Sequence, residues 1–508
     1  MPPRKGSSKV KTGCRTCKAR KVKCDEAKPK CMRCTTSGRQ CAGYEATMNQ
    51  GLSWYRPQQL TAHDQREGRA FQFFSHMVGP VLSGPMDTYF WTHLVVQFSH
   101  FEPAVRHAVL AISSLYEDFH QGGRVTRQKP CNHFALKHYS AAIQRVQSAQ
   151  DEQLVMLACI LFICIEYLQG DVEAALRHCR HGILILNRLG CSSWVRQYLM
   201  PILRRLSFVS FYLGVKPPAD ASVPGLIGFE APIPPKFTSI DEAQSAIDDL
   251  TVNAIKLVAT GEMNAAEGQS LEDKLQAFHT KICEFEASIP PTELPNRIAT
   301  CLMKMKFEMA RIQVDTMHGT AETRFDEHTE GFKRIVGHAR RASELKRMCQ
   351  TERPRASFTF ESGFLGLLAF VSIKCRDLPT RMEALSLMVP LASPKEGFHD
   401  VGTLYRVGRR GVEIEHGISL DDGTLENDPA AMAEYSFPSE ESRLFAGPIE
   451  HELDVIKSED GTTTYRRTVR FLKRLPGGGV HTQQEYITDQ KVGPAVLNVP
   501  GMRCAKPV

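Results

Sequence analysis

Residues 14–41 read CRTCKARKVKCDEAKPKCMRCTTSGRQC, and the six cysteines of this stretch organise the rest of the chain. Written as spacing, the stretch is C-x2-C-x6-C-x6-C-x2-C-x6-C. The first three cysteines, Cys14, Cys17 and Cys24, repeat with a constant offset of 17 positions as Cys31, Cys34 and Cys41. This internal repeat predicts two equivalent half-sites within one small module.

The cysteine spacing predicts a metal site. Two cysteines separated by two residues place both thiolates on one metal within a tight turn, and zinc prefers four such ligands in structural sites. Six thiolates complete two tetrahedra only if two of them are shared, and the repeat makes Cys14 and Cys31 the natural bridging pair. One zinc ion would then take Cys14, Cys17, Cys24 and Cys31, and the other would take Cys14, Cys31, Cys34 and Cys41. The alternative is a ribbon with one zinc on Cys14, Cys17, Cys31 and Cys34, which leaves two spare thiols.

Charge is distributed unevenly along the chain. Residues 1–41 carry a net charge of +11, whereas the whole chain carries +7, so the remaining residues sum to −4. Six thiolates and two zinc ions would still leave this segment near +9. A basic segment on a mildly acidic body indicates a polyanionic partner.

The residues between Cys17 and Cys24, KARKVK, are mostly good helix formers. They predict a short exposed helix that presents Lys18, Arg20, Lys21 and Lys23. A helix of fewer than two turns is not stable alone in water, so metal binding and folding should be one event. A basic helix fits the major groove of duplex DNA, where Arg and Lys donate to guanine and neutralise phosphates. The alternative is a solvated surface whose charge only offsets the anionic cluster.

Length and composition place the chain among soluble multi-domain proteins. It has 508 residues, of which 42% are hydrophobic and 23% charged, so two or more units are expected. The start, MPPRKGSSKVK, has no apolar core and is not a secretory signal. We therefore expect a reducing compartment, with the ten cysteines outside the cluster acting as small core hydrophobes. The longest apolar run, residues 154–165, is too short for a bilayer span and predicts a buried helix without a membrane role.

The predicted fold class is mainly α-helical, with a small zinc module at the N-terminus. We expect a flexible basic arm at 1–12, the zinc module at 13–43, a linker at 44–64, a large α-helical domain at 65–395, and a tail at 396–508 that is partly β or disordered. The linker has no heptad seam, and Pro57 would interrupt one. Apolar periodicity predicts helices near 66–78, 87–98, 102–115, 133–147, 151–169, 171–189 and 194–213, and a second helical block at 239–390.

The tail carries hairpin signals. Residues 452–456 and 462–472 flank the turn Asp460-Gly461, and Gly477 to Gly479 precede another apolar stretch at 484–487. Nucleophile-elbow, phosphate-loop, zinc-protease and dinucleotide motifs are missing from the sequence, so we do not expect an enzyme. His178, Cys179 and His181 lie on an apolar helix, where packing is a more ordinary role than metal binding, and we assign them no ligand role.

The stretch from Cys14 to Cys41 resembles the fungal zinc binuclear cluster (Zn2Cys6) of transcription regulators, including the proline-containing loop Lys28-Pro29-Lys30-Cys31. The body resembles a fungal-specific transcription factor domain of the second common type, carried by residues 80–117, 157–186 and 360–377. The resemblance implies two Zn2+ ions with Cys14 and Cys31 bridging. It also implies base contacts from Arg20 and Lys21, and recognition of CGG-like triplets. Family members commonly dimerise through a downstream coiled coil, which this sequence lacks.

This resemblance leads us to expect a nuclear, DNA-binding regulator that activates transcription by RNA polymerase II. The expected partners are double-stranded DNA and the transcription machinery or co-regulators, and a homodimer and a small-molecule effector are compatible with the family. A repressor would share every sequence feature. A zinc-dependent protein-interaction or RNA-binding module would keep the cluster but lose specificity for duplex DNA.

Overall fold

The computed structural model describes residues 13–27, 30–43, 65–84, 88–120, 132–189, 192–207, 233–260, 265–317, 319–349, 357–420, 432, 435–449, 454–457, 463–488 and 492–493. The arm at 1–12 and the linker at 44–64 lie outside the described residues. The chain divides into two compact units, residues 1–56 with 192–194, and residues 57–191 with 195–508. The domain boundaries drawn from the sequence stay a prediction.

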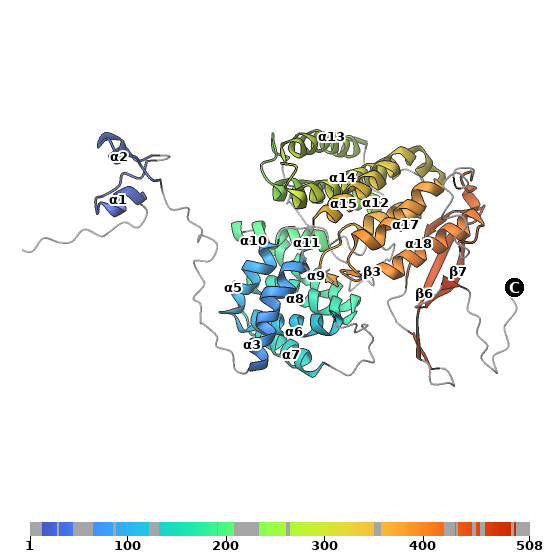
Figure 1. Cartoon of the computed structure of the whole chain (residues 1–508), viewed down its shortest axis with the longest axis horizontal. Coiled ribbons are helices and arrows are strands. Elements are labelled where there is room, and N and C mark those ends of the chain that lie inside the picture. Colours follow the sequence, from blue (N-terminus) through green and yellow to red (C-terminus); the bar gives the residue numbers. More distant parts are fainter. Residues whose placement is uncertain are drawn as a thin grey trace, which may run out of the picture. The chain divides into compact units, whose positions relative to one another are not determined.

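The N-terminal unit holds two short helices, α1 (Arg15–Ala19) and α2 (Met32–Thr36), each of which begins directly after a cysteine (Figure 1). The predicted helix over residues 18–23 is shifted, because α1 starts at Arg15 and its C-cap is Arg20. Lys21 follows with a left-handed backbone, which no right-handed helix can contain. Among the basic residues assigned to the helix, Lys18 is therefore the one inside it.

The first helical group of the large unit is built around one apolar helix. Its elements are α3 (Gln65–Phe73), η1 (Phe74–Val78), α4 (Gly79–Leu82), η2 (Phe90–Leu94), α5 (Val95–Ser99), α6 (Pro103–His120), α7 (His133–Gln147), α8 (Glu152–Gln169), α9 (Val172–Leu189), α10 (Ser193–Tyr198) and α11 (Met200–Leu206). The single helix predicted at 194–213 is two helices, α10 and α11, and residues 208–213 lie outside the described ones.

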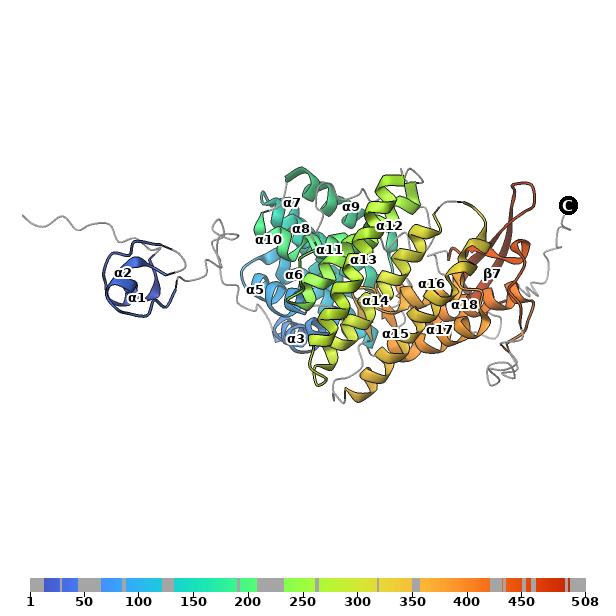
Figure 2. The same cartoon turned by 90° about the horizontal axis from the view of Figure 1, so that it is seen from above.

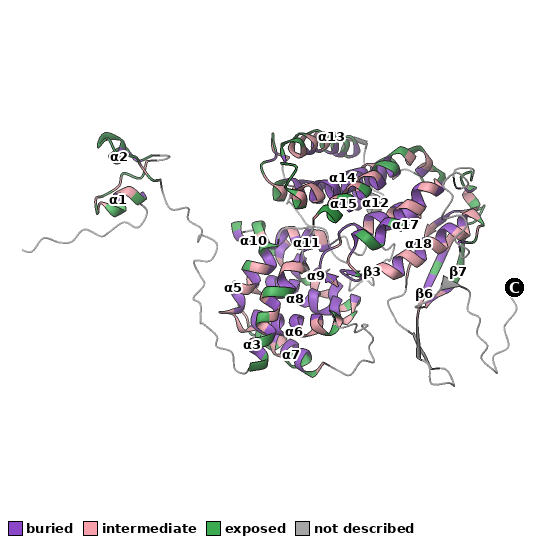
Figure 3. Cartoon of the chain, viewed as in Figure 1, coloured by how far each residue is buried: buried purple, intermediate pink, exposed green. Residues whose placement is uncertain are grey.

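Helix α8 is the buried centre of this group, and α6 and α9 pack against it (Figure 3). Asp151 caps its start by accepting the Gln153 N–H at 2.9 Å, and Gly170 ends it with φ +81°. By length and composition α8 could cross a membrane, and it is the one such helix among the described residues. However, 72% of the apolar window is buried inside the protein, as expected for a core helix.

The second helical group contains α12 (Ile240–Thr260), α13 (Ala265–Ser288), α14 (Leu294–Asp315), η4 (Glu322–His328), α15 (Thr329–Met348), α16 (Leu365–Lys374), α17 (Leu378–Leu391) and α18 (Val401–His416). Helix α14 runs between α12 and α13 on one side and α15 on the other (Figure 2). One of its faces, with Met303 and Phe307, joins the core formed with α12 and α13. The other face, with Met305 and Met309, joins the core formed with α15, α16 and α17.

Two sheets complete the large unit. The small one orders β1 (Phe358–Thr359), β2 (Lys395–Glu396) and β3 (His399–Asp400), with β1 parallel to β2 and β2 antiparallel to β3. The antiparallel one contains β4 (Leu444–Ala446), β5 (Asp454–Lys457), β6 (Thr463–Arg474), β7 (Val480–Thr488) and β8 (Val492–Gly493). Its order is β4-β6-β7-β8, and β5 also pairs with β6. The pairs β5–β6 and β6–β7 confirm both hairpins predicted in the tail.

The tail sheet is anchored on the helices by apolar contacts and by buried charges. Val469, Phe471 and Ile487 pack on Val407 of α18. The carboxylate of Glu415, also on α18, is fully buried and accepts hydrogen bonds from Arg376 (2.9 Å), Arg381 (2.5 Å) and the backbone N–H of Leu444 in β4 (2.6 Å). Residues after 395 thus share one packed unit with the helices before them.

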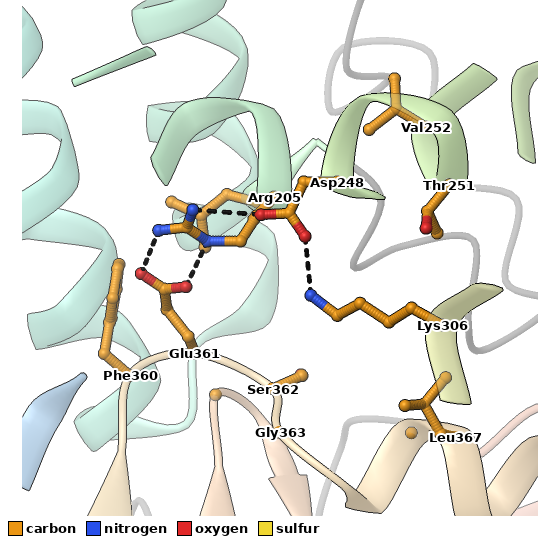
Figure 4. A pocket seen from close by; sticks show the side chains of 13 residues that line it. Arg205, Asp248, Thr251, Val252, Lys306, Phe360, Glu361, Ser362, Gly363 and Leu367 are labelled. Carbon is orange, nitrogen blue, oxygen red and sulfur yellow. Dashed lines mark hydrogen bonds and ion pairs between the residues drawn. The ribbon is translucent and has the colours of Figure 1, made fainter. Parts of the chain in front are cut away.

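A second ionic cluster joins the two helical groups at a small pocket (Figure 4). Arg205 of α11 pairs with both oxygens of Glu361 and donates to Asp248 of α12 at 3.2 Å. Lys306 of α14 donates to the other oxygen of Asp248 at 2.7 Å. The chain of alternating charges links three helices and the segment that follows β1, so it fixes how the two groups pack.

Candidate metal centre

The sequence repeat of the N-terminal unit reappears as a repeat of backbone structure. Cys14 is the N-cap of α1 and accepts the N–H of Cys17 on its sulfur at 3.3 Å. Cys31 is the N-cap of α2 and accepts the N–H of Cys34 at the same distance. Each of these N–H groups stabilises the anionic form of the sulfur that it contacts.

The two halves also share left-handed residues at equivalent positions after each helix. Lys21 and Glu26 have φ of +56° and +61°, and their counterparts 17 positions later are Gly38 and Gly43, with φ of +65° and +72°. The same hydrogen bonds close both turns, from the N–H of Val22 to Cys17 O (3.1 Å) and from the N–H of Arg39 to Cys34 O (3.0 Å). Glycine adopts this conformation freely, whereas Lys21 and Glu26 adopt it at a cost in conformational energy.

The six sulfurs converge in the centre of the module. They form two sets in which all sulfurs lie within 4.8 Å of one another: Cys14, Cys17, Cys24, Cys31, and Cys14, Cys31, Cys34, Cys41. The Sγ atoms of Cys14 and Cys31, which belong to both sets, are 3.6 Å apart. The Sγ distances of Cys17 to Cys31 and of Cys14 to Cys34 are 3.7 Å and 3.8 Å.

These distances fit tetrahedral zinc. Four sulfurs at about 2.3 Å from a zinc ion are separated by roughly 3.8 Å along each tetrahedral edge. Cys24 and Cys41 also belong to the sets, and the sulfur of Cys24 accepts the N–H of Cys14 at 3.4 Å. The Sγ atoms of Cys17 and Cys34 are also 3.8 Å apart, so these distances alone fit the one-zinc set as well. The observation that favours a binuclear site is that Cys24 and Cys41 each complete a set of four sulfurs.

The thiols themselves would not ionise readily in this centre without a cation. Burial raises the pKa of Cys14 and Cys31, and it raises the pKa of Cys17 to about 12. By contrast, backbone N–H groups of Cys31 and Gly43 lower the pKa of Cys41 to about 7. Zinc supplies the missing positive charge and deprotonates its coordinating thiols, which couples metal binding to the folding of the module.

Asp25 holds the loop after Cys24 against the second half. Its carboxylate accepts the N–H groups of Ala27 and Met32 at 3.1 Å and of Arg33 at 2.6 Å. These backbone donors, with that of Ala27 as the largest cause, lower the pKa of Asp25. The loop is thereby fastened to the first turn of α2, whose N–H groups have no partner within the helix.

The four basic residues belong to the first half of this module, on α1 and in the segment directly after it. Lys18, Lys21 and Lys23 are exposed, and Arg20 is half-buried and donates to the hydroxyl of Ser37 at 3.2 Å. The positions 17 residues later carry no charge, since they are Thr35, Ser37, Gly38 and Gln40. The two halves therefore share a backbone but differ in surface, and the first half alone carries this group of four cations.

The sequence reasoning missed the left-handed residues and the carboxylate of Asp25. Comparing each position with the one 17 residues later could have found Lys21 and Glu26, because their counterparts are glycines. In the described part of the body, no further group of His, Cys, Asp and Glu is close enough to hold a metal. His178 is half-buried, and its Nε2 lies 3.2 Å from the hydroxyl of Tyr139.

Comparisons with known proteins agree with this geometry. Residues 12–50 match the family model of the fungal Zn(2)-Cys(6) binuclear cluster domain. The aspercryptin biosynthesis cluster-specific transcription regulator atnN of Emericella nidulans is 28% identical over 218 residues, covering 36% of this chain and 36% of that protein. The transcription regulator lscL of Purpureocillium lilacinum is 28% identical over 201 residues, covering 33% and 47%.

Shorter matches concern the cysteine module. The arginine metabolism regulation protein II of Saccharomyces cerevisiae is 45% identical over 59 residues, which is 12% of this chain and 6% of that protein. In the two longer matches, the chain spans 36% of the length of atnN and 47% of the length of lscL. No solved structure is significantly similar to the chain. The chain thus carries a fungal Zn(2)-Cys(6) binuclear cluster domain, which binds two zinc ions, and it is homologous to the fungal transcription regulators that contain this domain.

Proposed function

We propose that the protein is a nuclear, sequence-specific DNA-binding regulator that activates transcription by RNA polymerase II. In this proposal Cys14 and Cys31 bridge two zinc ions, and Cys17, Cys24, Cys34 and Cys41 are the terminal ligands. Lys18, Arg20, Lys21 and Lys23 contact a CGG-like triplet in the major groove and the phosphates beside it. Double-stranded DNA and transcription co-regulators are the partners.

The observation that carries the proposal is the group of four basic residues in the first half of the zinc module. Its four cations lie on and directly after one metal-ordered helix, and the equivalent positions of the second half are uncharged. Arg and Lys donors on a rigid support can read guanine O6 and N7, while their neighbours neutralise phosphates. A charge that only offset the anionic cluster would have no reason to gather in one half.

The backbone at Lys21 supports a role in recognition. Lys21 has a left-handed backbone, and the equivalent residue of the second half is glycine. The first half therefore has a long cationic side chain at a position where a side chain costs conformational energy. Strain of this kind is most common at functional positions. We therefore assign Lys21 to the base-contacting pair, together with Arg20.

The test is DNA binding by the zinc-loaded full-length chain, measured by fluorescence anisotropy on duplexes with and without a CGG triplet. Lys21→Ala should weaken binding to the CGG duplex by about 1–3 kcal/mol, and should affect random duplex less. Lys30→Ala is the matched control, because Lys30 is an exposed lysine of the same module outside the basic group. An equal loss of affinity for both duplexes would mean that Lys21 contacts only phosphates.

The sign of regulation is tested separately. A reporter gene with bound sites upstream should lose expression when the gene for this protein is deleted, and should recover it with the wild-type chain. Increased expression after deletion would instead identify a repressor.

Competition with single-stranded and duplex RNA distinguishes both an activator and a repressor from an RNA-binding module, because only that module would exchange DNA for RNA at equal concentration.

A further inference from the structure

The pocket between the two helical groups contains hydrogen-bond donors that the protein itself does not use. It has a volume of about 700 Å³, counted with the solvent at its mouth, which lies in the usual range of small-molecule sites. Most of its lining is apolar, as is typical of such sites. The apolar part of the lining is formed by Leu206, Val252, Phe360 and Leu367.

Lys306 provides the first of these donors. The residue is only 7% exposed, and its ammonium group donates to one oxygen of Asp248 at 2.7 Å. An ammonium group has three N–H donors, and Lys306 has no second acceptor among the described residues. Figure 4 shows its side chain extending across the pocket towards Asp248, with Ser362 on the loop beneath it. Buried donors without a partner are costly, so an acceptor oxygen in this pocket would be favoured.

The loop after β1 and the first turn of α16 provide the other donors. The half-buried Ser362 lines the pocket, and its hydroxyl has no hydrogen-bond partner in the described part of the chain. The N–H of Leu365 is bound by Glu396 at 3.3 Å. The N–H groups of Gly366 and Leu367, which also line the pocket, have no acceptor among the residues that the structure describes. The amino end of a helix also favours negative charge.

The acidic side chains of the pocket do not make it a site for a cation. Arg205 binds both oxygens of Glu361, and Asp248 accepts hydrogen bonds from Arg205, Lys306 and Gln244. Two carboxylates are thus neutralised by two cations, and the unused hydrogen-bonding groups are mainly donors. An amine in the pocket would add a third cation beside Arg205 and Lys306, whereas acceptor oxygens would complete the donors.

We propose that this pocket binds a small carboxylate with an apolar body. The carboxylate oxygens accept hydrogen bonds from Lys306, Ser362 and the first turn of α16, and the apolar body packs against Phe360 and Leu367. This binding goes beyond the proposed function and does not depend on it. Because the walls of the pocket come from both helical groups, a bound carboxylate should also raise the temperature at which the body unfolds.

The experiment is a calorimetric titration of the zinc-loaded full-length chain with compounds that differ in charge. Phenylpropionate and isocaproate are the carboxylates, and phenylpropionamide and phenylpropylamine are the neutral and cationic counterparts. The carboxylates should bind with a Kd below about 1 mM, which compounds of this size can reach. The amide should bind about 10-fold more weakly, because it loses the charge-assisted hydrogen bonds. The amine should bind most weakly of the three.

Three variants locate the site. Lys306→Met keeps the aliphatic stem and removes the ammonium group, so it should abolish the preference for the carboxylate over the amide. Ser362→Ala removes one hydroxyl and should weaken carboxylate binding about 10-fold. The matched control is Lys304→Met, because Lys304 is another buried lysine of α14, pairs with Glu286 and does not line the pocket. This control should bind the carboxylates like the wild-type chain.

The carboxylate assignment is overturned if the wild-type chain binds neither carboxylate at about 10 mM, or binds the amide or the amine as tightly. The location is overturned if Lys306→Met and Ser362→Ala both keep the wild-type affinity, or if Lys304→Met loses as much as Lys306→Met. If Lys306→Met does not fold, Ser362→Ala decides the location, because it removes a hydroxyl that no described residue contacts. The titration involves no DNA, so its failure leaves the proposed function untouched.

Discussion

Lys21→Gly should raise the stability of the zinc module and lower its affinity for DNA. Lys21 has φ +56°, and the equivalent residue of the second half is Gly38 with φ +65°. A left-handed backbone costs a residue with a side chain about 1–2 kcal/mol. Glycine removes this cost, but it loses about 0.5–1 kcal/mol more conformational entropy on folding. The substitution should therefore stabilise the folded module by about 0.5–1 kcal/mol.

This gain should appear in the affinity for zinc, because metal binding and folding of the module are coupled. A gain of this size corresponds to about 2- to 5-fold tighter zinc binding. The same substitution removes a proposed base contact, worth about 1–3 kcal/mol or roughly 5- to 150-fold in affinity for the CGG duplex. Zinc affinity is measured by competition with a chromophoric chelator, and DNA affinity by fluorescence anisotropy.

Two further variants control this comparison. Glu26→Gly relieves the same backbone conformation, since Glu26 has φ +61° and its counterpart is Gly43, but it removes no cation. It should tighten zinc binding without weakening DNA binding. Lys21→Ala keeps the unfavourable backbone and loses the charge, so it should weaken DNA binding without the gain in zinc affinity. Looser zinc binding by both glycine variants would refute the reasoning from backbone strain.

Three other predictions concern the metal and the body. Elemental analysis should find two zinc ions per chain, and Cys14→Ala should lose more zinc than Cys17→Ala, because Cys14 belongs to both sulfur sets; one zinc in the wild-type chain would contradict the shared ligands. Glu415→Gln should cost about 3–5 kcal/mol in urea unfolding, because it leaves Arg381 buried without a carboxylate and Arg376 with Glu322 alone. The exposed Glu330→Gln, which pairs with Lys333, should cost less than about 1 kcal/mol, and a similar cost for both would refute the role of burial. Burial lowers the pKa of His178, His338 and His416 to about 4, well below the roughly 6.5 of an unfolded chain. From these histidines the unfolded chain binds more protons below pH 6.5, and they outnumber Glu396, which acts in the opposite direction because burial raises its pKa to about 7. The free energy of unfolding should therefore fall as the pH is lowered from 6.5 towards 5, and a constant value would count against it.

Much of the molecule follows from patterns within a few residues. The constant offset of the cysteines identified both sulfur sets, because ligands on tight turns are brought together by local geometry. The apolar periodicity of the body predicted α7, α8 and α9 to within a residue or two, and the hairpins of the tail followed from turn residues between alternating stretches. The helix predicted over residues 18–23 was displaced because residues 18–23 alone carry no signal for the turn at Lys21, which only the comparison with Gly38 indicates.

The tertiary structure decided which distant residues meet. Glu415, Arg376 and Arg381 are residue types that usually lie at the surface, and only the packing of α18 against β4 and α17 explains why they are buried together. The same holds for Arg205, Asp248, Glu361 and Lys306, which come from four segments of the chain. The sequence by itself determined the metal-binding pattern, the basic segment and most helices, because these depend on neighbours along the chain. The paired buried charges depend on contacts between remote segments, and so only the folded chain decided them.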